Sequence, residues 1–318
     1  MDTATVDSPL RVVAKDAVAK DVIVLTLQHV ERRRLADWSP GAHIDLVLPN
    51  GVTRQYSLCG DRWDPLNYRI AVLREPDGKG GSSFIHDHLN VGDRVGLGGP
   101  RNNFPLAPSD KYVFIAGGIG ITPLIPMIEQ AELLGASWQL LYGGRTRRSM
   151  AFLDELSYFG DKVTIFPADE RGLLPLAAWL ADAAEVDTKV YACGPRQLLD
   201  VIETYCRDWP IGKFRTERFI ARERVAPVRS TSFEVELARA GRTVTVTPHA
   251  SVLEAIHGVG VKVLSSCREG ICGTCEATVL SGVPDHRDSI LEDDERSLNN
   301  RMFLCVSRSC SDKLVLDL

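Results

Sequence analysis

The spacing of hydrophobic and polar positions changes twice along the chain, which has 318 residues. Up to about residue 108, short runs rich in β-branched residues, such as 22–27, 44–48 and 68–73, are separated by turn signals at 49–51 and 76–78. Many short strands at this spacing predict a barrel. The first part of the chain is therefore expected to be an antiparallel β-barrel.

After residue 108, longer apolar runs alternate with helical patterns. The expected strands are 111–116, 138–142, 163–166 and 189–192, and the expected helices are 124–134, 150–159, 174–180 and 196–208. Strands that alternate with helices predict a parallel sheet with helices on its faces, which is a doubly wound α/β domain.

The last part of the chain begins after a polar stretch at 221–230, which contains a proline and is expected to be a linker. A hairpin is expected between 233–237 and 243–246. Ser251 and Glu254 then have the spacing of a capping box that opens a short helix.

Four cysteines stand out in this last part. They follow the spacing C-x4-C-x2-C, then a long gap and a single cysteine: Cys267, Cys272, Cys275 and Cys305. This is the plant-type spacing for a [2Fe–2S] cluster, which needs four thiolates. Gly270 and Gly273 let the loop fold closely enough for backbone N–H groups to point at the sulfurs.

Two other uses of four cysteines compete with this interpretation. Structural zinc sites usually have two short cysteine pairs, whereas here one gap is four residues and the fourth cysteine is alone. Disulfides need an oxidising compartment, and the acidic residues 1–7 lack the features of a signal peptide. The pattern therefore favours an iron–sulfur cluster, and reduced thiols predict a cytoplasmic protein. Cys206 and Cys310 are expected to be packing residues.

Composition excludes other classes of protein. The net charge of −5 argues against nucleic-acid binding. No uninterrupted apolar run is long enough to span a bilayer, so no membrane association is expected.

Two motifs in the barrel region suit an anionic, flat ligand. The run Arg54-x-Tyr56-Ser57 offers a charge, a ring and a hydroxyl to such a ligand. The alternative is an ordinary strand with a surface arginine and a packed tyrosine, which has the same sequence pattern. Residues 78–83 are glycines, a lysine and serines before a helical stretch, which makes a phosphate cradle or a flexible hairpin loop. His86 and His88, just beyond, are expected to be structural. 

A third motif, 117–123, joins the first strand of the α/β region to its helix. A strand, a glycine turn and a helix make a dinucleotide-phosphate site, although Pro123 takes the place of the last glycine in the usual pattern. Thr122 is expected to be the N-cap and Pro123 the first helical residue. Cys193-Gly194-Pro195 follows the last strand at the edge where such sheets bind ligands, or it is only a tight turn.

The order of these motifs resembles the phthalate dioxygenase reductase and vanillate demethylase reductase family along essentially the whole chain. The resemblance implies three domains: an FMN-binding antiparallel β-barrel over 1–108, an NADH-binding α/β domain over 109–226, and a ferredoxin domain with an α+β, β-grasp fold over 227–318.

The resemblance also assigns residues to the cofactors. FMN would be contacted by Arg54, Tyr56 and Ser57, with its phosphate in the loop of Lys79, Gly81, Ser82 and Ser83. The nicotinamide nucleotide site would be lined by Gly118, Gly120, Thr122, Cys193, Gly194 and Pro195, and Phe219 would place its ring against the flavin. Lys79 stands where family members often have arginine, so the charge is kept but a bidentate grip is lost.

The implied function is that of an NADH-dependent iron–sulfur flavoprotein reductase. It would take a hydride from NADH onto FMN and pass single electrons through the cluster to a Rieske-type aromatic-ring or demethylating oxygenase. A flavin belongs between the two because NADH delivers an electron pair and the cluster accepts one electron at a time. No catalytic acid is needed for the hydride step.

Two alternatives keep parts of this chemistry. One is an electron-carrier ferredoxin that another protein reduces, against which the nucleotide motifs argue. The other is a reductase for a haem monooxygenase, in which only the partner differs.

Two charged segments bear on selectivity. Arg145, Arg147 and Arg148 follow the second strand of the α/β region, where the 2′-phosphate of NADPH is read, but a solvated basic loop is preferred and NADH is expected. The acidic run 292–295 suits docking onto a basic oxygenase surface, or is a solvated turn. Arg268 and Glu269, inside the cysteine loop, are further candidates for contact with the partner.

Overall fold

The computed structural model describes residues 9–76, 78–185, 187–224 and 226–318. The acidic start of the chain, the centre of the turn at 76–78 and residue 225 of the expected linker lie outside the described residues. The chain divides into two compact units, with Arg218 as the last residue of the first and Phe219–Leu318 as the second. Among the described helices, none combines the length and the apolar character needed to cross a bilayer.

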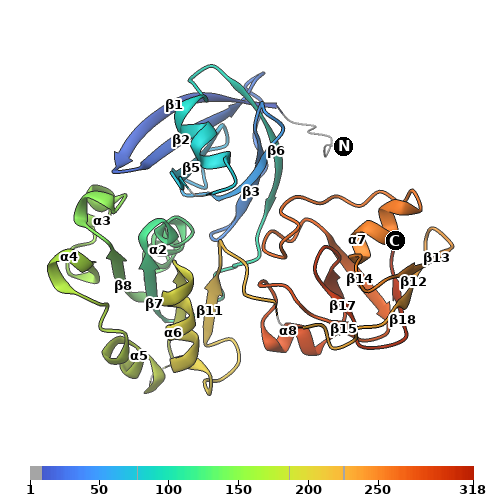
Figure 1. Ribbon diagram of the computed structural model, residues 1–318. Coiled ribbons are helices and arrows are strands. Elements are labelled where there is room, and N and C mark those ends of the chain that lie inside the picture. Colours follow the sequence, from blue (N-terminus) through green and yellow to red (C-terminus); the bar gives the residue numbers. More distant parts are fainter. Residues whose placement is uncertain (1–8, 77, 186, 225) are drawn as a thin grey trace. The chain divides into compact units, whose positions relative to one another are not determined.

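A six-stranded antiparallel sheet forms the first half of the first unit (Figure 1, blue to teal). Its strands, in sheet order, are β4 (Thr53–Ser57), β3 (His43–Val47), β6 (Arg94–Arg101), β1 (Pro9–Ala19), β2 (Val22–His29) and β5 (Asn67–Leu73). A bridge between Leu58 and Ile70 joins the two ends of this order and closes the sheet into a barrel. Helix α1 (Gly81–Asp87) lies between β5 and β6 in the chain.

A five-stranded parallel sheet forms the second half of this unit. Its order is β11 (Phe214–Glu217), β10 (Lys189–Cys193), β7 (Lys111–Gly117), β8 (Ser137–Gly144) and β9 (Val163–Pro167). The connecting helices are α2 (Leu124–Leu133), α3 (Leu153–Ser157), α4 (Ala168–Arg171), α5 (Leu176–Glu185) and α6 (Arg196–Cys206), with short 3₁₀ turns η1 (Gly118–Ile121), η2 (Arg147–Ser149) and η3 (Gly160–Lys162). Strand β7 is buried from its second residue to its last because helices cover both faces of the sheet.

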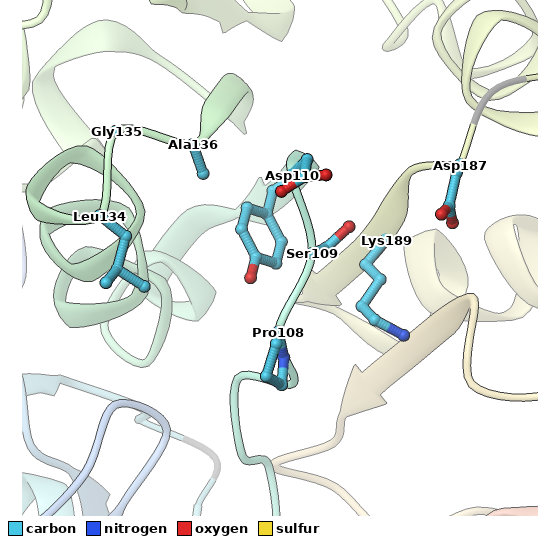
Figure 2. A pocket seen from close by; sticks show the side chains of 9 residues that line it. Pro108, Ser109, Asp110, Leu134, Gly135, Ala136, Asp187 and Lys189 are labelled. Carbon is cyan, nitrogen blue, oxygen red and sulfur yellow. The ribbon is translucent and has the colours of Figure 1, made fainter.

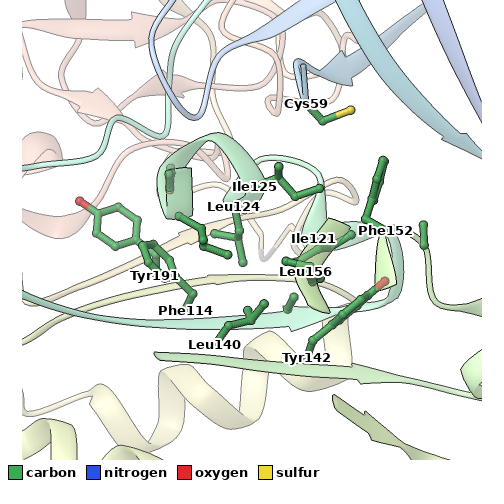
Figure 3. Packing of buried hydrophobic residues seen from close by; sticks show 14 of the residues in the cluster. Cys59, Phe114, Ile121, Leu124, Ile125, Leu140, Tyr142, Phe152, Leu156 and Tyr191 are labelled. Carbon is green, nitrogen blue, oxygen red and sulfur yellow. The ribbon is translucent and has the colours of Figure 1, made fainter. Parts of the chain in front are cut away.

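Barrel and parallel sheet share one apolar cluster. Val22, Cys59 and Ala71 of the barrel pack in the same cluster as Phe114 and Phe152 of the α/β half. Figure 3 shows Cys59 on one side of this cluster and Leu140 and Tyr142 on the other. The two halves of the first unit are therefore joined by a continuous core.

The second unit holds a mixed five-stranded sheet with a short pair of strands beside it. The sheet order is β13 (Arg242–Val246), β12 (Phe233–Leu237), β18 (Lys313–Leu316), β14 (Glu276–Ser281) and β16 (Arg301–Phe303), and β15 (Pro284–Asp285) pairs with β17 (Arg308–Ser309). Its helices are α7 (Val252–Gly258) and α8 (Asp293–Ser297). Both reciprocal bonds of the expected capping box are present at the start of α7, from Ser251 to Glu254 and back.

The local predictions for two segments are wrong. Thr122 does not cap α2: its backbone is already helical, with φ −58°, and its hydroxyl donates 3.0 Å to the carbonyl of Ile119. Pro123 occupies the N-cap position and α2 begins at Leu124, so Pro123 is not the first helical residue either. The helix expected over 150–159 is shorter, because Phe152 adopts a left-handed conformation with φ 64° and α3 can begin only after it.

Candidate functional site

Two of the glycine motifs interlock at the carboxyl edge of the parallel sheet. Cys193, the last residue of β10, pairs with Ala116 of β7. A Cβ atom on Gly120 would overlap the carbonyl group of Cys193, and one on Gly194 would lie 3.0 Å from the Cα of Gly117. Glycine is therefore required by packing at these positions. The structure brings the two motifs together as one site at the edge where open α/β sheets bind ligands.

The remaining residues expected at this edge differ in their exposure. Gly118 has φ 54° and open space beside it, so a ligand can approach the backbone there. Thr122 is only 2% exposed, while Pro195 precedes α6 and packs against Gly117. Burial raises the pKa of the Cys193 thiol well above its ordinary value, so this side chain stays neutral.

A half-buried carboxyl group joins this edge to the barrel. Glu217 ends β11 beside Cys193, and the hydroxyl of Ser57, at the end of β4, donates to its Oε2 atom at 3.4 Å. Burial raises the pKa of Glu217 to about 8, and the hydrogen bond from Ser57 opposes this shift. Sequence reasoning singled out Phe219 from this stretch and missed Glu217. The available signal was an acidic residue closing a strand at the ligand edge of the sheet.

In the barrel, Arg54 holds the glycine–serine loop. Its two terminal nitrogens donate to the carbonyl oxygens of Thr53 and Lys79, each at 2.7 Å. A Cβ atom on Gly81, the first residue of α1, would lie 2.6 Å from the Cγ of Arg54. The side chain of Arg54 therefore lies directly across this glycine, and the strand motif and the loop motif form one site.

The other residues expected here surround that contact. Ser82 accepts a hydrogen bond from the backbone of Glu75 at 3.1 Å, which ties the loop to the chain just after β5. Tyr56 is half-buried, and burial raises the pKa of its hydroxyl. Ser83 is half-buried in α1, and Lys79 is exposed.

The histidines after the loop make contacts within the barrel. A ring nitrogen of His86 lies 3.0 Å from the carbonyl oxygen of Val72, and the ring of His88 lies 5.4 Å from that of Phe84.

In the second unit, the thiols of the four predicted cysteines contact one another. The thiol of Cys267 contacts those of Cys272 and Cys305, and the thiol of Cys275 contacts that of Cys305. These contacts lower the pKa of Cys267, which favours its thiolate. The backbone N–H of Glu269 donates to its sulfur at 3.3 Å.

This donor set fits a cluster of two irons. Four thiols converge, and Gly270 and Gly273 both have φ 75°, which lets the loop curl around the sulfurs. Among the described residues, no group of three or more metal-ligating side chains is arranged to hold a single metal ion. A [2Fe–2S] cluster needs four thiolates on two irons, and the four contacting thiols supply that number of ligands.

The expected linker contacts the second unit. The backbone N–H groups of Arg222 and Val228 donate to Ser289 and Asp285. Phe219, expected to face a flavin, is the first residue of this unit and its side chain is 38% exposed.

The charged segments are partly neutralised by neighbours. Arg147, in the basic loop after β8, lies 3.6 Å from Glu170 of α4. In the acidic run, Glu292 and Glu295 form a reciprocal capping box, and Glu295 also pairs with Arg301 at 2.7 Å. Asp293 has a fully exposed side chain and lies 3.8 Å from the guanidinium of Arg296.

A separate cavity of about 570 Å³ lies at the opposite, amino edge of the parallel sheet. Figure 2 shows Leu134 and Gly135 on one side of it and Asp187 and Lys189 on the other. None of the motif residues lines this cavity. Ligands bind such sheets at the carboxyl edge, so we place the functional site there.

Comparison with known proteins supports the same division of the chain. The family model described as a 2Fe-2S iron-sulfur cluster binding domain matches residues 235–310. Phenoxybenzoate dioxygenase subunit beta from Ectopseudomonas oleovorans is 44% identical over 97% of each chain. The solved structure of phthalate dioxygenase reductase, described as modular for electron transfer from pyridine nucleotides to [2Fe-2S], is 35% identical, covers 98% of this chain and 97% of its own, and has a TM-score of 0.67. The chain belongs to the phthalate dioxygenase reductase family.

Another solved structure places this fold within a longer protein. An intact type IV self-sufficient cytochrome P450 monooxygenase is 41% identical with a TM-score of 0.92, and this chain spans 41% of its length.

The expected fold class is confirmed: an antiparallel flavin barrel, an α/β nucleotide domain and an α+β ferredoxin domain. The protein is an oxidoreductase that uses FMN, NADH and a [2Fe–2S] cluster, and it is the reductase component of an oxygenase system.

Proposed function

We propose that electrons enter this protein where the carboxyl edge of the parallel sheet meets strand β4, and leave through the cysteine loop. The observation that carries this proposal is the hydrogen bond between Ser57 and Glu217, because it joins the barrel site to the interlocked glycine motifs. A hydride donor at that edge and an acceptor on β4 would then be neighbours.

For FMN, we assign Arg54, Tyr56 and Ser57 to the ring system and its side chain, and the loop to the phosphate. The loop residues are Lys79, Gly81, Ser82 and Ser83. Support comes from the contact of Arg54 with this loop, which places a guanidinium beside the start of α1. FMN supplies the ability to accept an electron pair and release electrons singly.

For NADH, we assign the edge residues Gly118, Gly120, Thr122, Cys193, Gly194 and Pro195. The backbone at Gly118 has open space beside it and can approach the pyrophosphate, while the buried Cys193 and the half-buried Glu217 lie side by side at the ends of their strands. The protein needs no proton donor for hydride transfer, so its contribution is alignment.

For the cluster, we assign Cys267, Cys272, Cys275 and Cys305 as ligands, and Phe219 as the aromatic ring for the flavin. We keep the division into domains at 1–108, 109–226 and 227–318. Within it, residues 221–224 and 226–230 connect two functional parts, although hydrogen bonds from this segment already attach it to the second unit.

For the electron acceptor, we propose a Rieske-type oxygenase in the cytoplasm. The similarity to a phenoxybenzoate dioxygenase subunit along the full chain supports this partner. A haem monooxygenase is the second candidate, because the cytochrome P450 structure carries a segment similar to this chain.

Anaerobic addition of NADH to the purified protein tests this route. We expect NADH alone to bleach both the flavin and the cluster absorbance, and protein-bound flavin released by denaturation to be FMN by mass spectrometry. Bleaching that requires a second protein would support the carrier alternative and contradict the proposal. Comparing reduction of a Rieske oxygenase and of a haem monooxygenase by the reduced protein then separates the two partners.

A further inference from the structure

The boundary between the barrel and the parallel sheet carries one bidentate ion pair. Arg69, on β5, donates from its two terminal nitrogens to the two carboxylate oxygens of Glu155 on α3, at 2.9 and 2.6 Å. The guanidinium also lies 5.2 Å from the centre of the Phe152 ring. One arginine of the barrel is thus held by two residues of the nucleotide half.

Local structure on the barrel side links Arg69 to the proposed flavin strand. The backbone N–H of Cys59, two residues after Ser57, donates to the carbonyl of Arg69 at 2.9 Å. A Cβ atom on Gly60 would lie 2.7 Å from the Cβ of Arg69, so glycine makes room for this side chain. A movement of Arg69 would therefore displace the end of the motif that begins at Arg54.

On the nucleotide side, the pair is held by a strained residue. Phe152 has φ 64°, an unusual conformation for a bulky residue, and is only 4% exposed within the apolar cluster that the two halves share. It fixes the start of α3 and thus the direction of Glu155. A second tie lies nearby, where the backbone N–H of Lys20 donates to the carbonyl of Arg148 at 2.8 Å.

Stability alone does not account for this pair. The side chains of Arg69 and Glu155 are 30% and 47% exposed, and ion pairs at such exposure contribute about 0–1 kcal/mol. The apolar cluster already holds the two halves together. A bidentate pair adds a fixed direction more than it adds energy.

We infer that Arg69 and Glu155 are positioning residues for hydride transfer, which orient the nucleotide half so that nicotinamide meets the flavin at the reacting distance. The inference rests on the proposed function, which places the flavin on β4 and nicotinamide at the edge of the parallel sheet. Reacting atoms must approach to about 3–3.5 Å, and small misplacements cost large factors in rate.

Because of the surrounding charges, loss of Arg69 and loss of Glu155 are expected to have unequal effects. Burial, together with the nearby Asp61 and Glu155, raises the pKa of Glu129 on α2 to about 7, and the charge of Arg69 opposes this shift. Loss of Arg69 removes the positive charge that offsets these acidic groups, whereas loss of Glu155 removes one of the acidic groups. Arg69→Gln is therefore expected to be the more harmful change.

Rapid mixing of the complete flavoprotein with NADH, without oxygen, tests the inference. We expect the limiting rate constant of flavin reduction to fall about tenfold or more in Arg69→Gln and less in Glu155→Gln, with the apparent Kd for NADH within about twofold of the original protein. Arg69→Lys keeps the charge without the bidentate geometry and should fall between. The exchanged pair Arg69→Glu with Glu155→Arg should recover part of the lost rate.

Controls separate this role from general damage. Arg34→Gln removes an exposed ion pair with Asp37 that lies within the barrel, at 2.7 Å, and should leave the rate unchanged. Flavin content, cluster content and chemical reduction by dithionite should be normal in all variants. Original rate constants in both single variants would overturn the inference alone, whereas a parent protein that NADH does not reduce would overturn the proposed function and this inference together.

Discussion

Among single residues, Cys305 joins the two halves of the cysteine set, since its thiol contacts those of Cys267 and Cys275. We expect Cys305→Ser to lose or badly destabilise the [2Fe–2S] centre, because oxygen replaces one of four thiolates. The measured content of iron and sulfide should fall below two of each per chain, while the content of bound FMN stays unchanged. Cys310→Ser, in the same unit but outside the set, should keep the cluster. Zinc in place of iron in the parent protein would contradict the assignment.

Glu217 gives a second prediction at this scale. Because burial raises its pKa to about 8, the folded protein keeps a proton between pH 5 and 8 that the unfolded chain has released. The free energy of unfolding of the first unit should therefore fall as pH rises through this range. Glu217→Gln has no titrating group at this position. Between pH 5 and pH 9, its free energy of unfolding should therefore rise relative to that of the parent protein by on the order of 2 kcal/mol. Denaturant unfolding at both pH values checks this, and parallel curves for the two proteins would refute it.

At the scale of elements, β4 and α1 form the proposed phosphate site through the contact of Arg54 with Gly81. Gly81→Ala places a methyl group against the Arg54 side chain and should break its hydrogen bond to Lys79. The displaced guanidinium would no longer be held beside the FMN phosphate, and a hydrogen bond to a charged group is worth about 1.5–3 kcal/mol, so we expect FMN affinity to fall about tenfold or more. Fluorescence titration of the flavin-free protein measures it. Gly258→Ala, which meets open space at the end of α7, is the matched control. Unchanged affinity in Gly81→Ala would remove this loop from the flavin site.

At the scale of the whole molecule, the acidic run 292–295 is the candidate surface for docking of the oxygenase. Within the acidic run, Glu292 and Glu295 cap α8, whereas Asp293 and Asp294 are exposed, and Asp293 makes only a long contact of 3.8 Å with Arg296. We expect the double variant Asp293→Asn, Asp294→Asn to transfer electrons more slowly, at low salt, to an oxygenase that docks through a basic surface. The dependence of this rate on salt concentration should also weaken. Flavin reduction by NADH should equal that of the parent protein at each salt concentration.

The matched control for docking is the pair Asp161→Asn and Asp182→Asn, two exposed acidic residues of the first unit. It changes the net charge equally and should leave the partner reduction rate unchanged. If the Asp293 and Asp294 variant reduced the oxygenase at the parent rate, the acidic run would not be part of the docking surface.

Several features follow from the sequence alone because they are encoded locally. Alternation of apolar residues predicted the strands and helices, since burial of one face repeats with the period of the element. The spacing of the cysteines predicted the ligand set, because a cluster imposes its own geometry on a short loop. The glycine turns predicted the ligand edge, because close backbone approach excludes any Cβ atom there.

Tertiary structure decided what depends on residues far apart in the chain. Ser57 and Glu217 are separated by 160 positions, and Arg69 and Glu155 by 86, and neither spacing repeats in a local pattern. Packing also overrode local preference: Thr122 has a good capping side chain, but the chain is already helical there, and Phe152 takes a conformation that its size disfavours. The sequence thus determined the parts and their cofactors, whereas the contacts that align those parts arise only when the barrel and the parallel sheet share a core.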